Sequence, residues 1–192
     1  MGQLRFKYSA DQQYQLNAID AVCDLFRGQE FLDAHFMADL STPEQEVLPG
    51  LGIPQQRSIK QLYSVGHANG LHLSAMQLEQ NLHDVQERNN LPASKDLTDG
   101  RLRDFSVEME TGTGKTYVYI RTIYELNKRY GLTKFVIVVP SVAIREGVKK
   151  SFESTQSHFE SLYDHTPLDY FVYDSSRLGD ISNFAISSNL TV

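Results

Sequence analysis

The chain has 192 residues, and its content of 41% hydrophobic and 22% charged residues supports a packed globular core and excludes a mainly disordered protein. The single cysteine, Cys23, excludes an internal disulfide and a cysteine-rich zinc site. No stretch approaches the roughly 18 consecutive apolar residues of a membrane span, and the first residues lack the apolar core of a secretory signal. We therefore expect a cytoplasmic protein with no membrane partner.

The net charge of −6 argues, as a sum, against a protein that binds nucleic acid, because phosphate contacts need lysine and arginine. The acidic excess, however, lies in residues 1–100, which hold 13 acidic and 7 basic residues, whereas residues 101–192 hold 11 of each. We expect residues 1–100 to contain an N-terminal helix, a loop-rich segment and a capped helix. Residues 101–192 are expected to carry the chemistry.

Two helices are predicted in the first part. In residues 12–27 the apolar residues recur at spacings of three and four, and Gly28 follows where such a helix would end. Ser74 is a candidate N-cap of the second helix, and Gln77 completes a capping box. The prolines and glycines of residues 28–72 indicate loops with room for a hairpin.

Strands and helices alternate in the second part. The predicted order is strand 105–109, helix 117–130, strand 135–140, helix 141–154 and strand 169–174. Short connections between such elements are typical of a parallel α/β sheet. One apolar face is predicted for the first of these helices, formed by Val118, Thr122, Ile123 and Leu126.

A glycine-rich turn between the first strand and the first helix of this part carries the clearest chemical signal. It consists of Thr111, Gly112, Thr113, Gly114, Lys115 and Thr116. Glycines let backbone N–H groups approach phosphates closely, and the following helix adds its positive N-terminal end. Lys115 would contact the β- and γ-phosphates, and the Thr116 hydroxyl would bind the bridging Mg²⁺. The turn therefore predicts a site for ATP and Mg²⁺, with Lys115 and Thr116 in the catalytic roles.

The strict phosphate-loop pattern has a glycine five residues before Gly114, where this chain has Met109. The alternative interpretation is a glycine turn with an exposed lysine. The position of the turn between a strand and a helix favours the phosphate loop. Glu108 and Glu110 flank the turn and are interpreted as structural rather than catalytic.

Residues 107–131 and 134–153 resemble the first helicase motifs of the Res subunits of type III restriction enzymes, a branch of the superfamily two helicases and translocases. The resemblance implies a P-loop NTPase fold with a RecA-like parallel sheet. Here the lobe would be an incomplete first motor lobe, preceded by a helix and a loop-rich insertion. It also implies ATP and Mg²⁺ as cofactors, double-stranded DNA as a partner, and a modification (methyltransferase) subunit as a second partner.

The resemblance also assigns roles to residues outside the glycine turn. Gln15 matches the segment that reads adenine, and Pro140, Ser141 and Arg145 match a motif that binds the DNA backbone. Plainer interpretations remain for both sites. Gln15 would then be part of an ordinary amphipathic helix, and Ser141 an ordinary N-cap before a solvated face that carries Arg145 and Lys149.

An NTPase of this kind also needs an acidic residue at the end of a later strand to hold Mg²⁺ through water. The chain has no Asp-Glu pair, and the strand-terminal candidate is Asp174, which is followed by serine. We interpret Asp174 as a turn cap rather than as a Mg²⁺ residue. We accordingly expect the chain to be an N-terminal piece of a longer protein that does not by itself hydrolyse ATP.

Two classes of function follow from the sequence. The first is part of an ATP-dependent DNA translocase and helicase linked to endonuclease cleavage of DNA. The second is a P-loop nucleotide-binding module that does not act on DNA, or another superfamily two helicase with no link to restriction. The motif that begins at Pro140 favours the first class, because a generic nucleotide switch does not need it.

Overall fold

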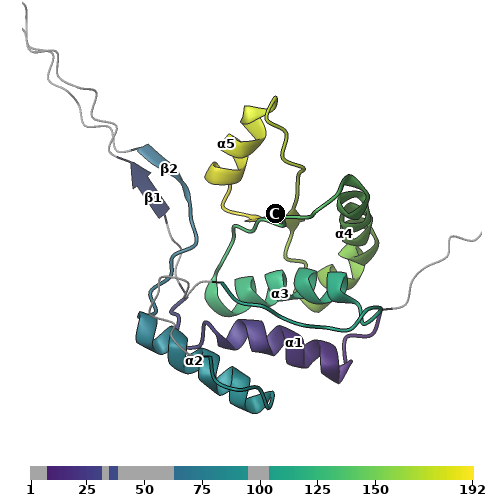
Figure 1. The fold of residues 1–192 in the computed structure, drawn as a ribbon. Coiled ribbons are helices and arrows are strands. Elements are labelled where there is room, and N and C mark those ends of the chain that lie inside the picture. The colour runs from purple at the N-terminus through teal and green to yellow at the C-terminus, as the bar shows by residue number, and fades with distance from the viewer. Residues whose placement is uncertain (1–7, 32–34, 39–62, 95–103) are drawn as a thin grey trace, which may run out of the picture.

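The computed structural model describes residues 8–31, 35–38, 63–94 and 104–192. The elements are α1 (Gln13–Asp24), β1 (His35–Ala38), β2 (Tyr63–His67), α2 (Ala75–Arg88), α3 (Lys115–Tyr130), α4 (Val142–Leu162), β3 (Leu168–Asp169), α5 (Leu178–Ile186) and β4 (Leu190–Thr191). Helix α1 packs on α2 and on α3, and α3 in turn packs on α4 (Figure 1). Within the described ranges, no helix is long and apolar enough to cross a membrane.

Helix α1 confirms the helix predicted for residues 12–27, and polar side chains tie its end to α2. The buried amide of Asn81 donates to the carbonyl oxygens of Leu25, at 3.0 Å, and Arg27, at 2.9 Å. Arg27 also forms an ion pair with Asp84 of α2. Gly28 has a φ of 92°, a conformation that favours glycine, and it ends the turn that follows α1.

Helix α2 begins with the predicted capping box. The Ser74 hydroxyl accepts a hydrogen bond from the Gln77 amide at 3.3 Å, and the Gln77 side chain accepts one from the Ser74 amide at 3.0 Å. The sequence indicated room for a hairpin within residues 28–72. The antiparallel pair of β1 and β2 lies in this segment. Residues 32–34 and 39–62 of that loop-rich segment lie outside the described residues.

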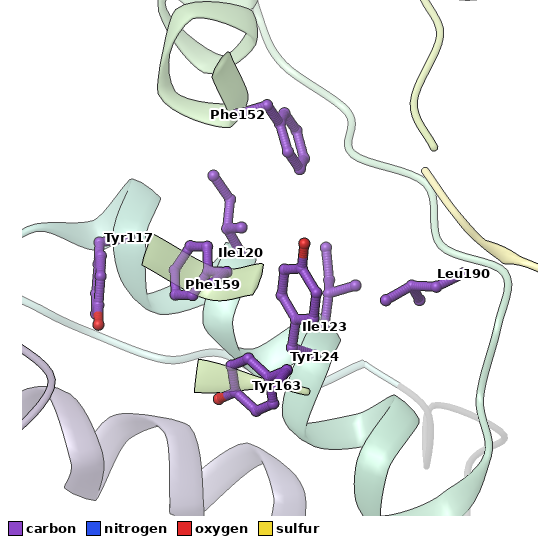
Figure 2. Close-up of a cluster of buried hydrophobic side chains, with 8 residues drawn as sticks. All are labelled: Tyr117, Ile120, Ile123, Tyr124, Phe152, Phe159, Tyr163 and Leu190. Atoms are coloured by element: carbon purple, nitrogen blue, oxygen red, sulfur yellow. The ribbon is translucent and has the colours of Figure 1, made fainter. Parts of the chain in front are cut away.

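Helix α3 is buried on two sides, whereas the sequence predicted one apolar face. One side packs on α4 in the cluster of Figure 2, which contains Tyr117, Ile120, Ile123, Tyr124, Phe152, Phe159, Tyr163 and Leu190. The other side places Val118 and Leu126 against Ile19 and Cys23 of α1. The prediction was incomplete because tyrosines bury their rings, so Tyr117 and Tyr124 add a second buried side that aliphatic spacing does not reveal.

Helix α4 extends to Leu162, eight residues beyond the end predicted at position 154. Ser141 caps it as predicted, since its side chain accepts from the Ile144 amide at 3.3 Å. The extension is stabilised by aromatic contacts with α3. Phe159 lies with its ring centroid 5.1 Å from that of Tyr117 and 5.2 Å from that of Tyr124.

The parallel sheet is much smaller than predicted. β3 and β4 pair in parallel, and Lys134 forms a single parallel bridge with Thr191 of β4 on the other side. Of the strand predicted at 169–174, β3 contains Asp169 alone. Residues 135–140 form no strand in the described chain, because the bridge lies at Lys134, just before them. Residues 105–109 form no strand in the described chain. A strand needs a neighbour that supplies hydrogen-bond partners, and an apolar or alternating pattern alone does not provide one.

We predict that Phe159→Ala destabilises the protein by about 3–5 kcal/mol, because it leaves a cavity at the α3–α4 contact. Phe159 is only 1% exposed. Urea unfolding followed by circular dichroism measures the change. Met76→Ala is the control, since Met76 is 79% exposed and its removal should cost less than about 0.5 kcal/mol. Equal effects of the two variants would contradict the assignment of the core.

Candidate phosphate-binding site

The glycine turn forms the N-terminal end of α3. Gly112 and Gly114 have φ angles of 84° and 85°, in the left-handed region that favours glycine. Gly114 is the N-cap of α3, so the first amides of the helix have no partner within the helix itself. A Cβ atom at Gly112 would meet nothing within 4 Å, which leaves open space beside the turn. Together, the free amides and the open space fit a phosphate group.

Gln15 of α1 lies directly against this turn. Its side chain is buried, and its Nε2 atom donates to the carbonyl oxygen of Thr113 at 2.9 Å. A Cβ atom at Gly114 would lie 2.7 Å from that same Nε2 atom, closer than real Cβ contacts occur. Position 114 therefore requires glycine for two reasons, its backbone conformation and the close approach of Gln15.

The side chains of the turn fold back onto its own backbone. The Lys115 ammonium donates to the Glu110 carbonyl oxygen at 2.8 Å, and the Thr113 hydroxyl donates to the same oxygen at 2.6 Å. Lys115 and Thr111 are exposed, and Thr116 is half-buried. The Lys115 ammonium is thus held over the turn by one exposed hydrogen bond, which a phosphate oxygen can replace.

Met109 occupies the position at which the strict phosphate-loop pattern has glycine. Its half-buried side chain packs against the cluster formed by Ile19, Cys23, Val118 and Leu126. Met109, two residues before the turn, is therefore fixed by apolar contact with α1 and α3. Glu110 contributes its carbonyl oxygen to the turn, which agrees with a structural role for this residue.

The residues matched to the DNA-backbone motif lie at the N-terminal end of α4. Pro140 and Ser141 are exposed, and Ser141 acts as the helix cap described above. The Arg145 guanidinium contacts Glu146 Oε1 at 3.1 and 3.2 Å. An exposed pair of this kind contributes at most about 1 kcal/mol, so Arg145 can exchange Glu146 for another anion at little cost.

Asp174 caps a turn, as the sequence predicted. One carboxylate oxygen accepts from the Ser176 amide at 2.9 Å and from the Ser176 hydroxyl at 2.7 Å. The hydrogen bonds from Ser176 lower the pKa of the Asp174 carboxyl. Across the part of the chain that the structure describes, no group of three or more His, Cys, Asp or Glu side chains could hold a metal ion.

Arg121 is a residue that the sequence analysis missed. It lies in the middle of α3 with 8% exposure, and it donates to the Ala10 carbonyl oxygen at 2.6 Å and to the Tyr163 hydroxyl at 3.2 Å. The Tyr163 hydroxyl in turn donates to Glu125 at 2.7 Å. Arg121 thus fixes the segment that leads into α1 and Gln15. The sequence did contain a sign of this role, because Arg121 stands among the apolar positions of the predicted helix. A charged side chain buried there would be unfavourable unless it had hydrogen-bond partners.

A family model described as "Type III restriction enzyme, res subunit" matches residues 10–166. The chain is 39% identical over 111 residues to the Res subunit of the type III restriction-modification enzyme EcoP15I of Escherichia coli, and 38% identical over 111 residues to that of EcoPI of Escherichia phage P1. Each match covers 57% of this chain and 11% of the relative.

The Res subunit of the StyLTI enzyme of Salmonella typhimurium is 50% identical over 68 residues, which are 34% of this chain and 7% of that protein. The matched stretch therefore spans about a tenth or less of the length of these relatives.

We predict that Gly114→Ala destabilises the chain more than Gly112→Ala. Both substitutions force alanine into a left-handed conformation, at a cost of about 1–2 kcal/mol, but only the first drives a Cβ atom into Gln15. Urea unfolding in a Gln15→Ala background separates the two effects by a double-mutant cycle. The two glycine substitutions should become equal there. An excess cost at Gly114 that persists without the Gln15 side chain would contradict the contact.

Proposed function

Because the chain belongs to the family of type III restriction enzyme Res subunits, we propose that it is the ATP-binding part of an ATP-dependent DNA translocase linked to endonuclease cleavage. One observation carries the proposal more than any other: two left-handed glycines open α3 beside free helix amides, with Lys115 and Thr116 in the first turn. That donor set suits a triphosphate and its Mg²⁺.

In this proposal the amides of the turn and the Lys115 ammonium would hold the phosphates of ATP, and the Thr116 hydroxyl would hold the Mg²⁺, which would neutralise phosphate charge. Lys115 would leave the Glu110 carbonyl oxygen to do so. The bound ATP supplies the free energy for movement along DNA.

Gln15 is the residue proposed to read adenine. One N–H of its side-chain amide is used by Thr113, which fixes the orientation of the amide next to the turn. The second N–H and the carbonyl oxygen then offer one donor and one acceptor, the pair that the adenine edge requires. The same side chain would thereby connect recognition of the base with the position of the phosphate loop.

Double-stranded DNA is the proposed partner of the N-terminal end of α4. The support comes from exposed Ser141 and from Arg145, whose pairing with Glu146 is exposed and weak. Contacts of this kind hold phosphates without reading sequence, as a motor requires. We propose that sequence recognition comes from a modification (methyltransferase) subunit, and that the protein acts in the cytoplasm. The relatives are named as Res subunits of restriction-modification enzymes, which supports this assignment.

We also propose that the 192-residue chain binds nucleotide weakly at best and does not hydrolyse it. Asp174, the candidate for the second Mg²⁺ position, already uses its carboxylate in the turn with Ser176. Rapid ATP hydrolysis by this chain that is lost in the Lys115→Ala variant would contradict this part of the proposal.

We predict that Lys115→Ala weakens binding of Mg·ATP by about 10- to 100-fold, the range expected when a charged hydrogen bond to phosphate is lost. Isothermal titration calorimetry on the purified chain measures the change. Lys128→Ala is the matched control, because Lys128 is exposed in the last turn of the same helix and should leave binding unchanged. Equal binding by Lys115→Ala and the unmodified chain would exclude the turn as the phosphate site.

A further inference from the structure

The hydroxyl of Tyr119 lies one turn of α3 after Thr116, and it is buried without a hydrogen-bond partner. Across the described ranges, no other buried side-chain nitrogen or oxygen atom lacks one. The Tyr119 ring packs against the apolar cluster that Figure 2 shows, so apolar contacts hold the side chain in place. A buried hydroxyl without a partner costs free energy, and its retention calls for a physical reason.

The hydroxyl of Thr116 differs from those of the threonines buried within α3 and α4. Thr122 donates to the Val118 carbonyl oxygen at 2.8 Å, and Thr155 donates to the Ser151 carbonyl oxygen at 2.7 Å. Each of these hydroxyls thus bonds to the carbonyl four residues earlier in its own helix. Thr116 stands in the first turn of α3 and makes no such bond among the residues that the structure describes. Its oxygen is therefore available to a ligand outside the helix.

The hydroxyls of Thr116 and Tyr119 lie near each other. Residues three positions apart share one face of a helix, so their side chains are within reach. Burial raises the pKa of the Tyr119 hydroxyl, and the Thr116 side chain acts in the opposite direction, as a close polar neighbour does. The pair nevertheless lacks the geometry of a hydrogen bond. Because the Tyr119 ring is packed and Thr116 borders the open glycine turn, rotation of Thr116 is the smaller movement that would complete the bond.

We propose that Tyr119 is a positioning residue for the Thr116 hydroxyl, and that the bond between them forms on binding of a nucleotide with Mg²⁺. The inference rests on the proposed function of the glycine turn. A threonine oxygen has two lone pairs. Tyr119 donates its O–H to one of them, which leaves the other directed at the metal ion. Since Mg²⁺ requires near-ideal octahedral geometry from its oxygen ligands, a fixed Thr116 side chain favours its binding.

The test removes only the phenolic oxygen, with Tyr119→Phe. Dissociation constants for ATP are measured by NMR titration, once with excess Mg²⁺ and once with EDTA, and their ratio reports the gain in affinity due to the metal. Urea unfolding without nucleotide is measured on the same proteins. Tyr130→Phe is the matched control, because the Tyr130 hydroxyl at the other end of α3 donates to the Cys23 carbonyl oxygen at 2.9 Å.

We expect Tyr119→Phe to reduce the Mg²⁺-dependent gain in affinity by about 3- to 10-fold, the range of one hydrogen bond, and to leave the affinity in EDTA unchanged. Its stability without nucleotide should equal or exceed that of the unmodified chain, because an unpartnered buried hydroxyl is removed. Tyr130→Phe should show the reverse, a lower stability and an unchanged gain. In a Thr116→Val background, which lacks the threonine hydroxyl, Tyr119→Phe should not change the gain further.

An unchanged gain in Tyr119→Phe, with binding still weakened by Lys115→Ala, would overturn the inference and leave the proposed function intact. An equal loss of affinity with Mg²⁺ and with EDTA would also overturn it, and so would a loss of stability like that of Tyr130→Phe. In either case Tyr119 would support the fold and not the metal ligand. If Lys115→Ala leaves binding unchanged, the proposed function itself fails, and the inference fails with it.

Discussion

The burial of α3 on two sides is the constraint on which the rest of the structure depends. Tyr117 and Ile120 pack against α4 at one side, and Val118 and Leu126 pack against α1 at the other. The glycine turn that we propose as the phosphate site is the N-terminal end of this same helix. The hydrophobic core therefore fixes where the turn lies, and this gives the proposed binding site a fixed geometry.

Polar contacts then set the finer position of the site. Gln15 donates a hydrogen bond to the Thr113 carbonyl oxygen, and its side chain leaves no room for a Cβ atom at Gly114. Arg121, buried in α3, holds the Ala10 carbonyl oxygen and so fixes the segment before α1. Any shift of α1 relative to α3 would move both Gln15 and the loop, so the proposed base-reading and phosphate-binding groups are mechanically connected.

The sequence predicted local features well and long-range ones poorly. The capping box of Ser74 and the cap of Ser141 were both predicted, because each depends on residues within one turn of its helix. The glycine turn was located for the same reason. The strands at 105–109 and 135–140 were not confirmed, because pairing depends on neighbours distant in the chain. Arg121 was missed because its partners lie far away in sequence, at Ala10 and Tyr163.

The proposed nucleotide site consists of the turn at the start of α3 together with Gln15. The most direct test is an NMR titration of the 15N-labelled chain with Mg·ATP. We expect the largest chemical-shift changes in the backbone amides of residues 112–116 and in the side-chain amide of Gln15. Saturable chemical-shift changes at other residues, with these signals unchanged, would contradict the proposed nucleotide site.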